Sequence, residues 1–112
     1  MALSNPDYSE LNHEEMANEI GLKAKHIPLL IASFLEESEL ILAKLQTAIE
    51  SSDYEAIRGA AHPLKGSAGN LHFDELYEMS REMEFAGAER NSGFEYAQYL
   101  EAMSQAVATI KI

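Results

Sequence analysis

Cysteine is absent from the sequence, so the chain can form neither a disulfide framework nor a thiolate metal site. Long apolar runs are missing too, since none approaches the roughly 18 residues that a membrane-spanning helix needs. The N-terminal stretch MALSNPDYSELNHEE has no basic start and no apolar segment, unlike a secretory signal. Together these absences predict a cytoplasmic protein with no membrane partner.

Basic residues are also few. The 112 residues include 8 Lys and Arg against 19 Asp and Glu, a formal net charge of -11. Such a surface repels phosphate backbones and anionic lipids, which argues against nucleic acid as a partner. The acidic charge keeps a small domain soluble and would suit a partner with a basic face.

Strand signals are scarce, because valine and threonine are few and no stretch alternates apolar and polar residues. Apolar residues instead recur at steps of three and four, which is typical of amphipathic helices. Helices are expected at residues 12–20, 27–51, 52–71, 73–86 and 96–110. The connections between the four longer ones are short, which favours antiparallel neighbours. The sequence therefore predicts a single all-α domain over residues 1–112, an up-down antiparallel four-helix bundle with a short additional N-terminal helix.

Residue types that favour helix ends support these boundaries. Asn12 is a plausible N-cap for the first helix, and Gly21 is a plausible stop. Pro28 falls in the first turn of the second helix, where proline is tolerated. Ser52 and Glu55 have the spacing of a capping box, so the third helix is predicted to open at Ser52.

The stretch AAHPLKGSAGNL, residues 60–71, places a histidine among poor helix formers. At about 100° per residue, His62 falls on the flank of the apolar stripe. Arg58, Lys65, Gly66 and Gly69 share that flank, because they lie four residues before it and three, four and seven after it. The glycines leave space around an accessible imidazole, and the two cations suit an incoming phosphoryl group.

Residues 62–71 resemble the signature of histidine-containing phosphotransfer (HPt) domains, written H-x-L-K-G-S-x-x-x-L, with Leu64, Lys65 and Ser67 at the motif positions. Further along, Met83 and Glu84 stand where the family commonly has a Leu-Glu pair. The length and the expected bundle also agree with the family, so the resemblance covers nearly the whole chain.

The resemblance implies a role for several residues. His62 would be the phosphoacceptor, whose Nε2 takes a phosphoryl group from a receiver-domain phospho-aspartate and passes it to another receiver aspartate. Lys65 would steady the phosphoryl oxygens, and Gly66 would leave room for the ring and for docking. Glu84 would hydrogen-bond the other ring nitrogen. Ser67 matches the motif without a defined role.

The resemblance also implies partners: receiver domains of response regulators, a hybrid sensor histidine kinase, or both. Docking is expected on the accessible sides of the second and third helices around His62. A monomer without cofactor or metal is expected. No G-x-x-x-x-G-K-[ST] motif is present, so a phosphate carrier without its own ATP-dependent kinase activity is predicted.

One departure from the family lies just past the motif. The family usually has glycine after the position of Leu71, whereas this chain has His72. Either the turn between the third and fourth helices differs from the family's, or His72 adopts a left-handed conformation, which histidine visits more often than most residues.

Three other functions are compatible with a helical bundle. One is a structural or adaptor bundle that binds receivers without phosphotransfer, against which His62, Lys65 and Gly66 argue. Another is a metal site built from the four histidines and carboxylates, although no H-x-x-x-H or H-E-x-x-H spacing exists. The third is the dimerising phosphoacceptor region of a sensor kinase, in which an acid rather than Pro63 usually follows the histidine.

Overall fold

The computed structural model describes residues 2–111, and within them the regular structure is entirely helical. The elements are α1 (His13–Ile20), the 3₁₀ turn η1 (Ala24–His26), α2 (Ile27–Glu50), α3 (Tyr54–Asn70), α4 (Asp74–Ala88) and α5 (Tyr96–Thr109). The all-α prediction is confirmed. Across the described residues, no helix has the length and apolar character needed to cross a bilayer.

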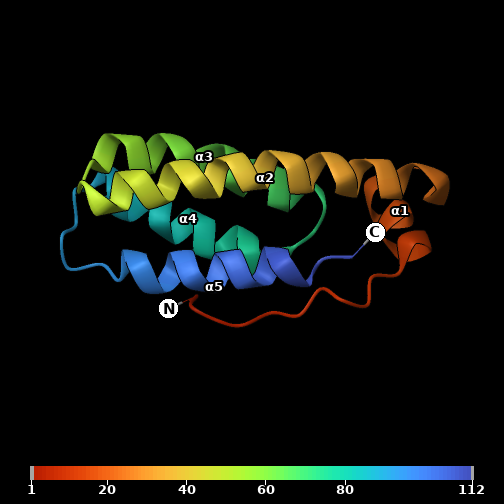
Figure 1. Cartoon of the computed structure of the whole chain (residues 1–112). Coiled ribbons are helices and arrows are strands. Elements are labelled where there is room, and N and C mark those ends of the chain that lie inside the picture. Colours follow the sequence, from red (N-terminus) through yellow and green to blue (C-terminus); the bar gives the residue numbers. More distant parts are fainter. Residues whose placement is uncertain (1, 112) are drawn as a thin grey trace.

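The four longer helices run alternately up and down, as predicted, and α1 lies near the start of α2 (Figure 1). The most extensive helix pair is α3 with α4, followed by α2 with α3. This order matters for function, because His62 lies on α3 and its predicted partner Glu84 lies on α4.

The core follows the apolar stripes seen in the sequence. Its largest fully buried apolar side chains are Tyr99, Phe73, Ile27, Ile31, Leu45, Ile57, Leu64, Leu76, Met79, Met83 and Met103. Burial of such side chains contributes roughly 1.5–3 kcal/mol each relative to exposure. The same burial fixes the rotation of each helix, and with it the direction in which the polar flanks face.

The helix ends agree with the sequence at α1 and differ at α3. The Asn12 side chain accepts a hydrogen bond from the Glu15 backbone N–H at 3.0 Å, and Gly21 has a φ of 84°. The predicted Ser52 cap of α3 is wrong, because Asp53 is the N-cap and accepts from the Ala56 N–H at 3.1 Å. Ser52 instead takes a left-handed φ of 51° that ends the turn from α2.

The turn between α3 and α4 contains His72 with a φ of 60°, the left-handed conformation that one of the two sequence interpretations required. The backbone N–H of the next residue, Phe73, donates to the Ala68 carbonyl at 2.9 Å. This bond closes the end of α3 and turns Phe73 into the core, where it is 1% exposed. The His72 ring itself lies at the surface, with Nδ1 3.5 Å from a carboxylate oxygen of Glu19.

An extended segment before α1 was not anticipated from the sequence. It runs along the bundle beside α5 (Figure 1). Tyr8 fastens it: its backbone N–H donates to Thr109 Oγ1 and its hydroxyl donates to Glu75, both at 2.9 Å. The Tyr8 ring also packs on Phe73, with centroids 4.7 Å apart. The segment is thereby part of the packed structure.

Candidate functional site

His62 lies in the middle of α3, which continues as an α-helix through Pro63. The neighbouring Ala61 and Leu64 are fully buried and hold the helix against the core. His62 is therefore rotated onto the flank that faces α4, and 64% of its side chain is exposed. The histidine combines a fixed backbone with an accessible ring.

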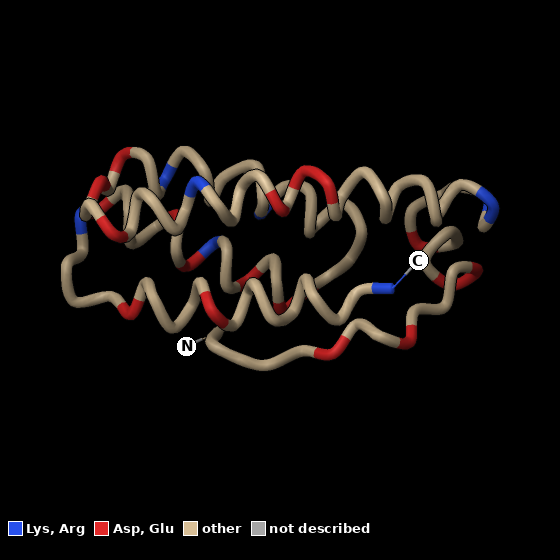
Figure 2. The backbone as a smooth tube through the Cα atoms, viewed as in Figure 1, with Lys and Arg blue, Asp and Glu red and all other residues tan. Residues whose placement is uncertain are grey.

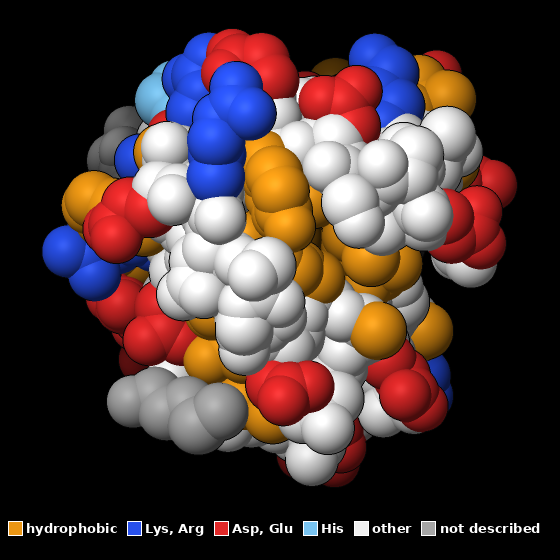
Figure 3. Space-filling model, turned by 90° about the vertical axis from the view of Figure 1, so that its left-hand side faces the viewer, with side chains coloured by type: hydrophobic (Ala, Val, Ile, Leu, Met, Phe, Trp, Pro, Cys, Tyr) orange, Lys and Arg blue, Asp and Glu red, His pale blue; other side chains and the backbone are white. Residues whose placement is uncertain are grey.

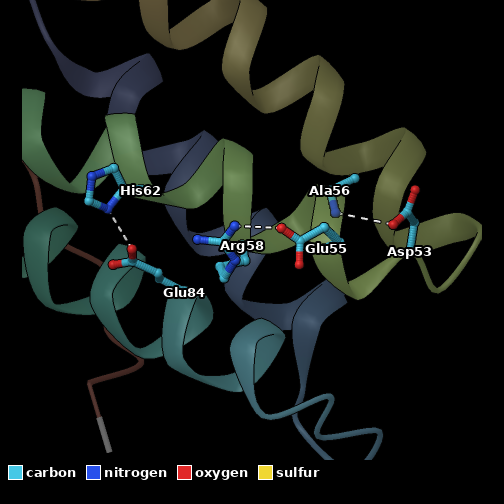
Figure 4. A network of polar contacts seen from close by, with 6 residues as sticks. All are labelled: Asp53, Glu55, Ala56, Arg58, His62 and Glu84. Atoms are coloured by element: carbon cyan, nitrogen blue, oxygen red, sulfur yellow. Dashed lines mark hydrogen bonds and ion pairs between the residues drawn. The ribbon is translucent and has the colours of Figure 1, made fainter.

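The Glu84 carboxylate joins two side chains of α3. Its Oε2 lies 2.5 Å from His62 Nδ1, a contact drawn in Figure 4, and its Oε1 lies 2.7 Å from Lys65 Nζ. Glu84 is largely covered, with 17% of its side chain exposed. Both carboxylate oxygens are thus engaged, one by the imidazole and one by the ammonium.

This contact fixes the arrangement of protons on the ring. An ionised carboxylate can only accept hydrogen bonds, so the proton lies on Nδ1 of His62, which donates it to Glu84. The lone pair of the neutral ring is then on Nε2. In Figure 4 that nitrogen points away from Glu84 and from α4. The exposed nitrogen is the nucleophilic one.

The charge state of Glu84 results from opposing effects. Its partial burial raises the pKa of the carboxyl, but hydrogen bonds from Lys65 and His62 lower it by more, and the net pKa lies below its usual value. Glu84 is therefore ionised at neutral pH, which the tautomer of His62 requires.

The two cations expected beside His62 both have carboxylate partners. Lys65 is bound to Glu84, whereas Arg58 Nη2 lies 2.5 Å from Oε1 of Glu55, one turn earlier on α3 (Figure 4). The hydrogen bond that Arg58 donates to Glu55 raises the pKa of the guanidinium, and the negative charge of Glu84 adds to the effect. Arg58 shares the flank of His62 as predicted, but its guanidinium is directed at Glu55 and not at the imidazole.

The two glycines of the motif have different surroundings. A Cβ on Gly66 would meet no atom within 4 Å, so the surface beside His62 is open there. A Cβ on Gly69 would lie 3.1 Å from the ring of Tyr77 on α4. The expectation that Gly69 extends the space around His62 is therefore wrong, because Gly69 admits the Tyr77 ring between the helices.

Ser67 lies on the opposite flank of α3 from His62. Its hydroxyl donates to Glu37 Oε1 on α2 at 2.5 Å. Ser67 therefore links α3 to α2 and makes no hydrogen bond to the imidazole. This contact gives the motif serine a structural partner that the sequence did not reveal.

Gly87 is an important residue of the site that the sequence analysis missed. A Cβ on Gly87 would lie 3.1 Å from both the Arg58 backbone nitrogen and the Tyr54 carbonyl oxygen. Its glycine character thus lets α4 approach α3 closely, one turn after Glu84. The available signal was its spacing, because Gly87 lies three residues after Glu84 and therefore on the same side of α4.

A groove of about 690 Å³ lies between α2 and α3. It approaches the site at Pro63, and its lining is Ile41, Ala43, Lys44, Thr47, Ala48, Ser51, Asp53, Ala56, Gly59, Ala60 and Pro63. Leu40 of α2 is 64% exposed and lies between Glu37 and Lys44 along the same flank. Figure 3 faces the end of the bundle with the α2–α3 turn and shows hydrophobic side chains in a hollow between polar ones.

Charge is unevenly distributed along the chain. Acidic residues are spread over most elements, whereas the few basic residues are scattered, and two of them, Arg58 and Lys65, lie on α3 within a turn or so of His62 (Figure 2). In the part of the chain that the structure describes, no group of three or more His, Asp and Glu side chains is placed to hold a metal ion. The local chemistry is that of an imidazole set between carboxylates and cations.

Comparison with known families gives one match. A family model described as Hpt domain matches residues 29–110, which span nearly all of α2 and the whole of α3, α4 and α5. The matched region includes His62 and Glu84. No curated protein and no solved structure matches the chain.

Proposed function

The chain belongs to the Hpt domain family, whose members are phosphocarrier modules of two-component phosphorelays, and from this premise we propose that His62 is the phosphoacceptor. Its Nε2 takes a phosphoryl group from the phospho-aspartate of one receiver domain. It then passes the group to an aspartate of another receiver. The chain acts as a carrier without ATP-dependent kinase activity of its own.

A single observation supports this proposal most strongly: 64% of the His62 side chain is exposed, while Nδ1 is held by Glu84 at 2.5 Å and Nε2 points away from Glu84 (Figure 4). A nucleophile must present its lone pair to the incoming group, and a positioned partner on the second ring nitrogen keeps the lone pair on Nε2. The imidazole is thus prepared for attack by a contact between two helices.

The transfer step follows from this arrangement. The Nε2 lone pair of His62 forms the N–P bond as the P–O bond to the receiver aspartate breaks, and the bonding pair returns to the aspartate oxygen. In the second transfer the N–P bond breaks and its electron pair returns to Nε2, while an oxygen of the next aspartate bonds phosphorus. In both steps the proton on Nδ1 stays in place, hydrogen-bonded to Glu84.

Lys65 and Gly66 are proposed to assist at the outer face of the ring. Lys65 lies one turn after His62, and its flexible ammonium can exchange Glu84 for a phosphoryl oxygen. Gly66 has open space around it, so a receiver surface can approach the ring without a side chain in between. Arg58, one turn before His62, adds positive charge along the approach.

We propose that receivers dock over His62 and along the groove between α2 and α3. The exposed Leu40 and the small side chains of the groove offer apolar area, and apolar anchors near the centre of an interface contribute most of its affinity. The partner is a response-regulator receiver or the receiver of a hybrid sensor kinase. The chain is proposed to work as a monomer, in the cytoplasm.

Phosphoryl transfer from a purified phosphorylated receiver tests the proposal. We expect the chain to gain an acid-labile, base-stable phosphate, and we expect His62→Gln to gain none. His26→Gln is the matched control, since His26 is an exposed histidine away from the site, and it should behave as the unaltered chain does. Phosphate uptake by His62→Gln would refute the assignment. Receiver binding without any transfer to the unaltered chain would establish the adaptor function instead.

A further inference from the structure

We propose that Glu84 makes phosphorylated His62 a ready donor and a poor store of phosphoryl groups. The carboxylate keeps a proton on Nδ1 while Nε2 carries the phosphoryl group, and it competes with that group for Lys65. This inference rests on the proposed function of His62 and concerns what happens after the group has arrived.

The geometry supports both parts of the proposal. Glu84 holds His62 Nδ1 at 2.5 Å and Lys65 Nζ at 2.7 Å, each through a different oxygen. Only 17% of the Glu84 side chain is exposed, so water competes weakly for the two contacts. An amide at this position could accept from the ring as well, but it would bring no negative charge.

The state of the ring decides how easily phosphorus leaves. When neutral His62 with its proton on Nδ1 forms the N–P bond, the product is a phosphorylated imidazolium, a cation. The positive ring is the better leaving group, because the electron pair of the broken bond returns to a nitrogen that already lacks electron density. Loss of the Nδ1 proton to solvent would leave a neutral phosphorylated imidazole, which holds phosphorus more firmly. Glu84 opposes that loss by pairing with the cation.

Lys65 further lowers the stability of the phosphorylated state, because Glu84 competes for its ammonium. A phosphoryl group carries negative charge that an ammonium stabilises, and Lys65 is the cation nearest to His62 along α3. In the structure this ammonium is already bound by Glu84. The phosphoryl group must therefore draw Lys65 away from a carboxylate, which reduces the net stabilisation of the phosphorylated state.

The groups that surround the ring are few, so a pH profile can be interpreted. From α4 the ring faces Glu84, and from its own helix it has Lys65 and Arg58 as neighbours, with Glu55 bound to Arg58. Arg58 and Lys65 oppose a positive ring, while Glu84 favours it at the shortest distance. The carboxylate is therefore expected to dominate.

The test uses phosphoramidate, a small-molecule phosphoryl donor, so no receiver is needed. Phosphorus NMR of phosphorylated His62 is followed from pH 5 to 9 in the full chain and in Glu84→Gln, because the resonance moves as Nδ1 gains or loses its proton. We expect the midpoint in Glu84→Gln to lie roughly one to three pH units lower, the shift that an opposite charge at this range produces. At pH values above both midpoints, its phosphohistidine should last about tenfold longer for each unit of difference between the two midpoints.

Two variants serve as controls. Lys65→Gln keeps the Glu84 carboxylate beside the ring and removes the ammonium that binds this carboxylate. The midpoint of the Nδ1 titration in Lys65→Gln should therefore not fall below that of the unaltered chain. Glu101→Gln removes one negative charge from the exposed side of α5 and should leave the midpoint unchanged. Circular dichroism of all variants checks that the helices are retained.

The outcomes separate this inference from the proposed function. Equal midpoints in Glu84→Gln and the unaltered chain, or an equally low midpoint in Lys65→Gln, would overturn the role of Glu84 while receiver exchange at His62 could still be demonstrated. If the midpoints differ as expected but no phosphorylated receiver transfers to His62, the ring chemistry stands and the relay function fails.

Discussion

The close approach of α3 and α4 at Gly87 permits a sharp test of how the site is held together. In Gly87→Ala, the new methyl group would lie 3.1 Å from the Arg58 backbone nitrogen, 3.1 Å from the Tyr54 carbonyl oxygen and 3.3 Å from Ile57 Cγ2. Two of these three neighbours are backbone atoms inside a helix, which cannot move aside alone. The two helices must therefore separate as units, and Glu84 lies within one turn of the point of separation.

The expected magnitude combines two opposing effects. Alanine is better than glycine in a helix interior by about 1 kcal/mol. Inserting a methyl group into a packed contact costs roughly 1–3 kcal/mol. We therefore expect Gly87→Ala to lower the free energy of unfolding by about 1 kcal/mol. Gly66→Ala is the matched control, because the same methyl group there meets nothing within 4 Å. That variant should raise the free energy of unfolding by up to about 1 kcal/mol.

Urea unfolding followed by circular dichroism measures both variants, and equal slopes with urea show that the two-state comparison is valid. Opposite changes in the midpoint of unfolding are the expected result. If Gly87→Ala stabilised the protein as much as Gly66→Ala, the contact between α3 and α4 would not depend on Gly87, and the reasoning would be refuted.

Two further predictions concern stability. Asp53→Ala should lower the free energy of unfolding, measured in urea, by about 1 kcal/mol, because it removes the hydrogen bond that the N-cap side chain accepts from the Ala56 N–H. Ser52→Ala is the control and removes no cap. A larger loss of stability in Ser52→Ala than in Asp53→Ala would contradict this assignment. Burial and the hydrogen bond to Glu82 raise the pKa of Tyr99 to about 12. Its contribution is therefore complete below about pH 10 and is lost as the pH rises from about 10 to 12, so Tyr99→Phe should unfold with a shallower dependence on alkaline pH. If the free energy of unfolding of Tyr99→Phe depended on alkaline pH as steeply as that of the unaltered chain, this role of Tyr99 would be refuted.

The helices and their order were predictable because local periodicity determines which side of each helix is apolar. The conformation of His72 could be anticipated from the sequence, because a turn position that usually has glycine often requires a left-handed residue. The first residue of α3 was harder to predict. Ser52 and Asp53 both favour N-cap positions, and the choice between them depends on how the chain leaves α2.

The pairing of charges was beyond the sequence, because it depends on the rotation and spacing of helices that are not neighbours in sequence. Sequence reasoning placed Lys65 and Arg58 beside His62, but the carboxylates that bind them could not be chosen from 19 acidic residues. Gly69 was misassigned for the same reason, because its neighbour Tyr77 comes from another helix. Family resemblance did supply the position of Glu84, which periodicity alone did not.

The extended N-terminal segment contributes to the core of the module, so a cut that removes it also removes core contacts. The family match begins at residue 29, yet Tyr8 and Ile27 lie before it and belong to the core. A fragment restricted to the matched residues would uncover the ring of Phe73 and leave Thr109 without the backbone donor of Tyr8. The packed core therefore extends beyond the residues that the family model matches.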